Sequence, residues 1–103
     1  MIRRRASKSA EFKREWTKLS RKLRLDHPTC EKCGATEKLL VHHILIRKLY
    51  PEYALDPRNL VVLCPKCHNF KRGSAHKDGI VFAEWLRTAK PEQYKEILEM
   101  SSV

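Results

Sequence analysis

Long apolar runs, glycine-rich linkers and internal repeats are all missing from this chain. Without about 20 consecutive apolar residues there is no candidate membrane span, and the arginine-rich residues 1–5 are not followed by the apolar stretch of a secretory signal. Only 3 of the 103 residues are glycine, which leaves little room for a hinge between domains. We therefore expect one soluble, intracellular domain without membrane contact.

Acidic residues are also scarce, because 12 Asp and Glu accompany 22 Lys and Arg, for a formal net charge of +10. A surplus of this size attracts polyanions, nucleic acid above all. Residues 1–25 contain ten basic and two acidic side chains, so most of the surplus lies in the N-terminal segment. A solvated helix face that only aids solubility is the alternative explanation for such a run.

The four cysteines form two Cys-x-x-Cys pairs, Cys30 with Cys33 and Cys64 with Cys67. A domain of this size gains little surplus stability from its core and often needs an additional cross-link. In a reducing compartment such pairs favour metal binding over disulfides, and four thiolates suit one tetrahedral zinc ion. The pairs therefore predict a closed, structural zinc site, with free thiols or a redox pair as alternatives.

An amphipathic helix is predicted over residues 9–25, where apolar residues recur at helical spacing. His27 and Pro28 end it. We assign its apolar stripe to core packing and to no chemistry; the stripe consists of Phe12, Trp16, Leu19 and Leu23. Residues 1–8 are predicted to be a flexible basic arm, and residues 9–103 a single domain.

Downstream of the first cysteine pair, the pattern predicts two strands followed by helices. The strands are short β-branched runs, and the helix after the second strand begins behind Pro65 and ends at Gly73. The predicted ranges are strands at 39–46 and 60–63, a short helix at 66–72, and two longer helices at 80–89 and 91–100. The residues expected to face the core from the last two helices are Val81, Phe82, Trp85, Leu86, Tyr94, Ile97 and Leu98.

Three histidines, His42, His43 and His68, lie close to the cysteines in the sequence. Consecutive residues of a strand point to opposite faces, so His42 and His43 need separate partners. One ring can bind a metal while the other faces a water molecule beside it. The cysteine site would hold His68 near both. For any single histidine, a hydrogen-bonded, half-buried ring is the alternative.

Residues 41–44 and 59–69 resemble the motif of HNH endonucleases in its zinc-stapled form, in order, spacing and cysteine frame. The resemblance covers residues 30–73. It implies an α+β fold, in which a ββα-metal core with a four-cysteine zinc knuckle carries flanking N- and C-terminal helices. By resemblance, His43 is the general base, and His42 and His68 are ligands of a catalytic divalent metal.

The same resemblance makes Asn59 the residue that ties the loop to the hairpin. Asn69 is either an auxiliary polar contact or an ordinary residue of the helix surface. His27 and His76 lie outside the motif and are assigned no role.

The implied activity is metal-dependent hydrolysis of DNA, by nicking or double-strand cleavage, with low sequence specificity and 5′-phosphate and 3′-hydroxyl products. Imidazole at His43 suits proton abstraction from water, and a divalent cation can neutralise charge on the phosphate. Many family members carry aspartate where this chain has His42. Because histidine ligands suit transition ions better than magnesium, we expect Mn²⁺, Ni²⁺, Mg²⁺ or Zn²⁺ to be usable.

Beside such a centre, basic residues are predicted to contact DNA phosphates; they are Arg14, Lys18, Arg21, Lys22, Lys71 and Arg72. One alternative is a zinc module that binds DNA without cutting it. Another is an RNA-directed HNH nuclease, although the aromatic residues follow helix stripes rather than a base-stacking pattern. Analogy with phage members of the family predicts a terminase partner in DNA packaging, the host-cell cytoplasm, and a monomer or weak dimer.

Overall fold

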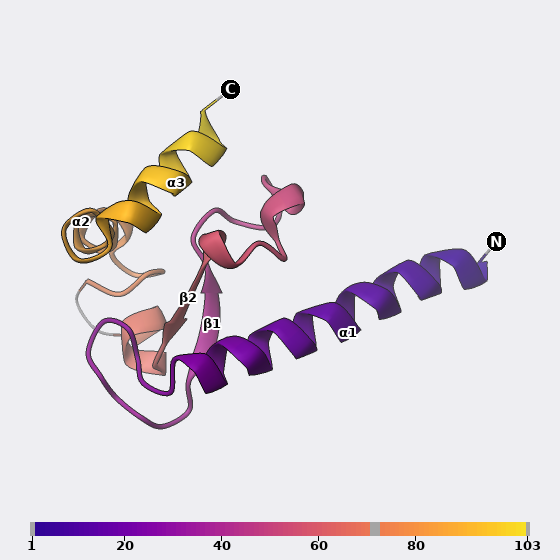
Figure 1. Ribbon diagram of the computed structural model, residues 1–103, viewed down its shortest axis with the longest axis horizontal. Coiled ribbons are helices and arrows are strands. Elements are labelled where there is room, and N and C mark those ends of the chain that lie inside the picture. Colours follow the sequence, from indigo (N-terminus) through magenta and orange to yellow (C-terminus); the bar gives the residue numbers. More distant parts are fainter. Residues whose placement is uncertain (1, 71–72, 103) are drawn as a thin grey trace.

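The computed structural model describes residues 2–70 and 73–102, and the side chains of residues 10–69 and 73–102. A long helix, α1 (Ile2–Asp26), passes one side of a small body, and its N-terminal half projects beyond that body (Figure 1). The helix begins seven residues before the predicted start, because residues 2–8 contain no glycine or proline and consist mainly of good helix formers. Its end before His27 is as predicted. The flexibility of residues 1–8 stays a prediction.

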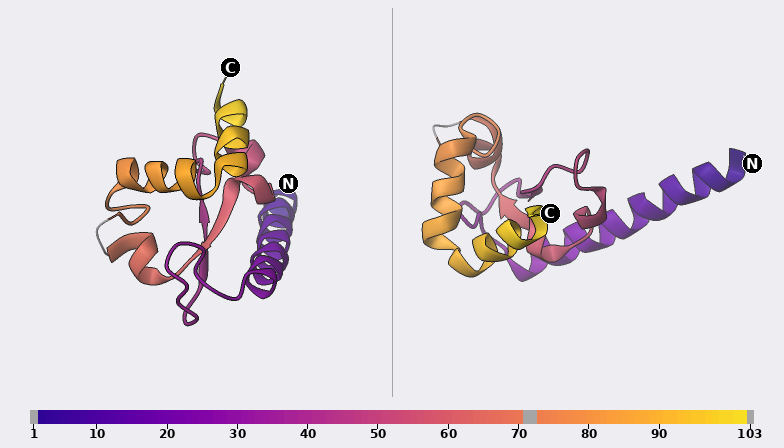
Figure 2. Two further views of the ribbon diagram at one scale, coloured as in Figure 1. Left: turned by 60° about the vertical axis from the view of Figure 1, so that its left-hand side comes forward. Right: turned by 90° about the horizontal axis from the view of Figure 1, so that it is seen from above.

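Two strands, β1 (Leu40–His43) and β2 (Leu60–Leu63), pair antiparallel, with His43 opposite Leu60. The second strand matches its predicted range, whereas the first ends three residues early. Strand β1 ends at His43 because the next two backbone N–H groups donate to Asn59 instead of to the partner strand. Ile44 N–H donates to the Asn59 carbonyl at 2.8 Å, and Leu45 N–H donates to the Asn59 side-chain oxygen at 2.6 Å. The hairpin lies between α1 on one side and the segments 66–70 and 79–89 on the other (Figure 2).

Three short helical turns connect the larger elements. Two of them, η1 (Pro51–Tyr53) and η2 (Pro57–Asn59), lie in the loop that joins the strands. The third, η3 (Lys66–Phe70), occupies the place of the predicted helix over 66–72. Gly73 follows with φ +82°, a backbone conformation that favours glycine and that turns the chain back after η3.

The last two helices, α2 (Gly79–Ala89) and α3 (Pro91–Ser101), lie within one residue of their predicted bounds. The buried cluster at the centre of the fold consists of Cys30, Val61, Leu63, Cys64, Cys67, Phe82 and Leu86. Val81 and Leu98 were predicted to face this core, but they are 47% and 52% exposed. Each helix buries only a narrow stripe, and Met100 rather than Leu98 accompanies Ile97 in the buried part of α3.

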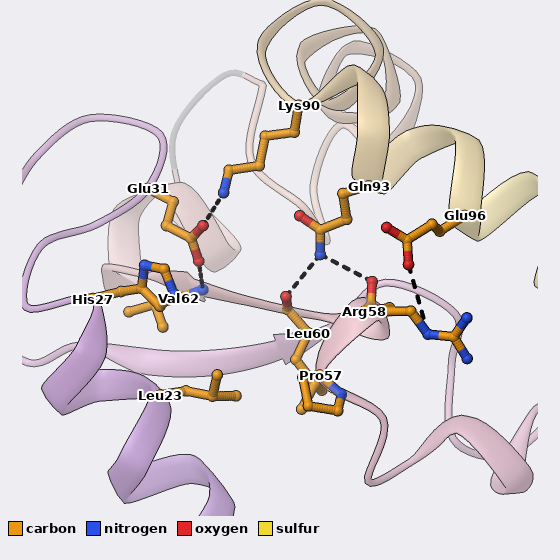
Figure 3. A pocket seen from close by; sticks show the side chains of 10 residues that line it. All are labelled: Leu23, His27, Glu31, Pro57, Arg58, Leu60, Val62, Lys90, Gln93 and Glu96. Atoms are coloured by element: carbon orange, nitrogen blue, oxygen red, sulfur yellow. Dashed lines mark hydrogen bonds and ion pairs between the residues drawn. The ribbon is translucent and has the colours of Figure 1, made fainter.

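Polar contacts attach α3 to the cysteine-bearing loop and to β2 (Figure 3). The Glu31 carboxylate, which lies between the first two cysteines, accepts hydrogen bonds from Lys90 Nζ and from Val62 N–H. Gln93 Nε2 donates to the carbonyls of Arg58 and Leu60 at 3.0 and 2.9 Å. These residues line a hollow of about 270 Å³, whose charged groups already bind one another, so we assign it no ligand.

The predicted fold class is confirmed, since two antiparallel strands, flanking helices and a four-cysteine cluster make a small α+β domain. Among the described residues, no helix combines the length and hydropathy of a membrane span.

Candidate metal centres and catalytic site

The four cysteines come together as predicted, with their Sγ atoms within 4.8 Å of one another. Cys33 Sγ lies 3.5 Å from Cys64 Sγ, so the two pairs meet across the hairpin. Gly34 N–H donates to the Cys30 carbonyl at 2.8 Å, and Gly34 has φ +82°, which closes the tight turn around the first pair. Four sulfur donors in such a cluster fit one tetrahedral metal ion.

Electrostatics also favour a cation among these sulfurs. Burial raises the pKa of the Cys30 thiol, but backbone N–H groups of Cys33, Cys64 and Lys32 outweigh burial and lower the pKa to about 7. Burial, together with the three other thiols, raises the pKa of Cys67 to about 12. Four thiolates therefore do not coexist here without a positive charge between them, and a divalent metal supplies that charge.

A second cluster of possible ligands consists of His42, His68 and His76, whose ring nitrogens lie within 4.8 Å of one another. His42 points from β1 to the side away from α1, where its ring contacts Phe82 with centroids 5.6 Å apart. His68 is in η3, and its Nε2 lies 2.9 Å from Nε2 of His76. The two predicted ligands are thus brought together.

His76 was assigned no role from the sequence, but its ring belongs to this cluster of possible metal ligands. After the turn at Gly73 the chain runs back along η3, where Ala75 N–H donates to the Cys67 carbonyl and His76 N–H donates to the His68 carbonyl, both at 2.9 Å. These bonds place the His76 ring beside His68. The glycine between two histidines eight residues apart was the sequence signal for this return.

The buried His42 and the half-buried His68 are neutral at neutral pH. Burial, helped by the nearby His68, His76 and His43 rings, lowers the pKa of His42 to about 3. Burial and His76 also lower the pKa of His68. A neutral imidazole offers a lone pair to a metal, so this cluster fits a divalent ion that three nitrogens hold while other coordination positions stay open.

His43 lies on the opposite face of β1, toward α1. Its ring stacks on Trp16 with centroids 4.6 Å apart and planes inclined by 20°. Its Nε2 lies 2.9 Å from the carbonyl oxygen of Ala54. Because a carbonyl only accepts, Nε2 carries the hydrogen, and in the neutral ring Nδ1 carries the lone pair. These two contacts fix the position of the ring hydrogen and the orientation of His43, the residue predicted to be the general base.

Asn59 is fully buried and uses both ends of its amide. Its Oδ1 accepts from Leu45 N–H at 2.6 Å, and its Nδ2 donates to the carbonyls of Leu45 and Tyr53 at 3.0 and 3.2 Å. Tyr53 directly precedes Ala54, so Asn59 fixes the loop whose carbonyl orients His43. This is the tie between loop and hairpin that the sequence predicted for Asn59.

Asn69 contacts the metal-ligand cluster from η3. Its amide nitrogen lies 3.0 Å from Nδ1 of His68, the ring nitrogen that does not face His76. Of the two sequence alternatives for Asn69, the structure favours the auxiliary polar contact, because an amide at this position fixes the orientation of the ligand ring.

Trp16 is the residue of the candidate site on α1 that the sequence pattern did not reveal. Its stripe was assigned to packing alone, and no pattern within the stripe marks one aromatic ring as the neighbour of a histidine 27 positions away. The stacking makes α1 one wall of the site that contains His43.

The predicted DNA contacts on α1 are not brought to this site. Arg14, Lys18 and Arg21 recur at spacings of four and three residues on the helix face opposite Trp16, and they are exposed. Lys22 pairs with Asp26 at 2.7 Å. The charge pattern predicted these residues beside the candidate catalytic site, whereas the packing of α1 turns their side chains away from His43. Their contact with DNA stays a prediction. Lys71 and Arg72 lie outside the described residues.

Replacing His76 by alanine should lower the affinity of the histidine cluster for a divalent ion by at least about tenfold, since even outer partners of metal ligands have effects of that size. Calorimetric titration of zinc-loaded protein with Ni²⁺ measures this affinity. The exposed His27 is the matched control, and His27→Ala should leave the affinity unchanged. Equal Ni²⁺ affinities for His76→Ala and the parent would exclude His76 as a ligand.

Comparison with known proteins adds one finding. Residues 30–73 match the family model of the HNH endonuclease, which confirms the resemblance noted in the sequence over the same residues. The match includes both cysteine pairs, His42, His43 and His68, but it excludes α1, His76 and the last two helices. Neither the curated proteins nor the solved structures contain a match to the chain.

Proposed function

We propose that this chain, with its HNH endonuclease segment at residues 30–73, hydrolyses phosphodiester bonds of DNA with the help of a divalent metal. The observation that carries the proposal is the arrangement at the end of β1. There the hydrogen bond of Nε2 to the Ala54 carbonyl orients the His43 ring and leaves Nδ1 outside that bond, and the adjacent His42 belongs to a cluster of three possible metal ligands. General base and metal site are the two parts that metal-assisted hydrolysis requires.

In the proposed reaction His43 Nδ1 accepts a proton from the water molecule that attacks phosphorus. The Ala54 carbonyl keeps the hydrogen on Nε2 and stabilises the imidazolium that forms. Asn59 acts through the backbone, because its amide holds the segment 53–54 against the strand. This role fits the arrangement of the His43 ring, in which Nε2 is bound to a carbonyl and Nδ1 is left to accept the proton.

His42, His68 and His76 would hold the catalytic metal, with Asn69 orienting His68. When bound there, a divalent ion would supply positive charge to offset the negative charge on the phosphate and on the departing 3′ oxygen. Three nitrogen donors favour transition ions such as Zn²⁺, Ni²⁺ or Mn²⁺ over Mg²⁺. The cysteine cluster would hold zinc in a closed site that takes no part in the chemistry.

The net charge of +10 supports a polyanionic substrate, and phosphate contacts hold a protein on DNA without reading its bases. We therefore propose low sequence specificity and 5′-phosphate and 3′-hydroxyl products. The links to phage DNA packaging, a terminase and the host-cell cytoplasm, and the monomeric or weakly dimeric state, stay predictions from the sequence resemblance.

Cleavage of supercoiled plasmid by zinc-loaded protein tests the proposal directly. We expect no cleavage without added ions and conversion to nicked or linear DNA with Mn²⁺, Ni²⁺ or Zn²⁺ at rates at least equal to those with Mg²⁺. Activity restricted to Mg²⁺ would contradict the histidine ligand set. Protein that retards the plasmid on a gel but cuts it with none of the four ions would be a DNA-binding module. Faster cleavage of a matched RNA would favour the RNA-directed alternative.

A further inference from the structure

Arg47 lies in the loop after β1, four residues beyond His43, and its guanidinium covers an aromatic ring of α1. Its Cζ atom is 3.9 Å from the centroid of Phe12. Phe12 and Trp16 are four residues apart, so they are neighbours on one face of the helix. Because His43 covers Trp16, the guanidinium and the imidazole lie next to each other over α1, about one helical turn (~5–6 Å) apart along its axis.

The Phe12 ring lies against the central carbon of the Arg47 guanidinium. The N–H groups around that carbon stay available to a ligand, in the fork that matches two oxygens of a phosphate. Among the described side chains, no carboxylate lies within ion-pair distance of Arg47. The ring also restricts the long side chain, so less conformational entropy is lost when a ligand binds.

The other candidate cations are less well placed. Arg58, the second arginine of the loop between the strands, is bound to Asp56 at 2.6 Å and to Glu96 at 3.6 Å. The basic residues of α1 named above lie on the face opposite Trp16. Arg47 therefore combines proximity to His43, an ordered side chain and a charge that no described acidic group neutralises.

We propose that Arg47 binds a phosphate of the substrate strand next to the phosphate that is attacked at His43, and that Phe12 is the positioning residue that holds it there. This inference rests on the proposed function, which supplies the nucleic-acid strand. The ligand chemistry is a phosphodiester oxygen pair, and the helix outside the family match thus contributes to substrate binding through two aromatic rings.

The test compares Arg47→Gln with Arg24→Gln, which removes the same charge from an exposed position 12 residues beyond Phe12 on α1. Binding of a fluorescent duplex to zinc-loaded protein without added ions is followed over a range of NaCl concentrations. Loss of one phosphate contact should reduce the slope of log K against log[NaCl] by about 0.9 and weaken binding near 0.1 M salt about tenfold. Arg24→Gln should keep the parental slope.

Two further variants separate charge from position. Arg47→Lys keeps the charge but lacks the forked N–H groups of a guanidinium. Relative to Arg47→Gln, we expect it to recover the parental salt slope and only part of the parental affinity. Phe12→Leu keeps an apolar side chain at this position and the Arg47 charge, and it should raise KM with little change in kcat. Circular dichroism and zinc content verify that each variant is folded.

Binding and cleavage are measured separately, so the two proposals can fail separately. Arg47→Gln with the parental slope and affinity would overturn the inference, whether or not the parent cuts DNA. An Arg47-dependent slope in a protein that never cuts would contradict the nuclease and support the phosphate site. A parent that does not bind the duplex would overturn both.

Discussion

The His43→Ala variant should cut supercoiled plasmid about 10²- to 10⁴-fold more slowly than the parent, the usual contribution of a positioned general base. The loss should appear in kcat, because His43 removes a proton during the reaction and adds little to the binding of the strand. Initial rates of nicking with saturating Mn²⁺ or Ni²⁺ measure the effect. Duplex affinity should stay within about twofold of the parental value.

The matched control is His27→Ala, which removes an exposed imidazole at the end of α1 and should keep the parental rate. His43 stacks on Trp16, so truncation can also loosen α1. His43→Asn, which keeps polar reach but has no basic nitrogen, distinguishes the two effects. Both His43 variants should cut DNA slowly, although their thermal unfolding temperatures should differ. A His43→Asn protein that cuts at the parental rate would remove His43 from the mechanism.

Loss of a cysteine ligand is expected to have the largest effect on stability. Cys30→Ala should release the structural metal and leave the chain without a cooperative unfolding transition at 25 °C. The apparent free energy of structural zinc binding is about 10–16 kcal/mol in zinc-finger peptides, which equals or exceeds the total stability of a typical small domain, about 5–15 kcal/mol. Zinc content by atomic absorption and thermal unfolding by circular dichroism measure the outcome.

Thr29→Ala, at the exposed residue just before Cys30, is the control and should keep both zinc and the transition. The four-cysteine cluster also holds part of the histidine cluster in place. His68 directly follows Cys67, and His68 N–H donates to the Cys64 carbonyl at 2.9 Å. Cys30→Ala should therefore also lose Ni²⁺ binding at the histidines. Full zinc content with an unchanged transition in Cys30→Ala would show that the sulfurs do not form a metal-binding cage.

Much of the fold could be read from local sequence patterns. The two Cys-x-x-Cys pairs predicted the cysteine cluster. The apolar runs predicted the second strand at its observed bounds and the last two helices to within one residue of theirs. These features depend on short-range spacing, which is what propensity and periodicity describe. The early end of β1 could not be read in this way, because Asn59 ends it from 14 positions away by bonding to Leu45.

The site was predicted only where family resemblance covered it. His42 and His68 meet as expected, and Asn59 holds the loop. His76 and Trp16 lie outside the motif, and both were given no chemistry. Their roles depend on the turn at Gly73 and on the face with which α1 packs on the hairpin. For the same reason the charge of α1 could be counted from the sequence, but the helix face that carries it could not be related to His43.

By itself, the sequence determined the donor types, their spacing and the net charge: four thiols in two pairs, adjacent histidines on a strand and a basic first helix. Only the tertiary structure decided that a third histidine joins the cluster, that an indole covers His43, and that Arg47 covers Phe12 on the same helix. The physical reason is that donor chemistry belongs to individual residues. Proximity instead depends on backbone reversals and on helix orientation, which many weak contacts fix together.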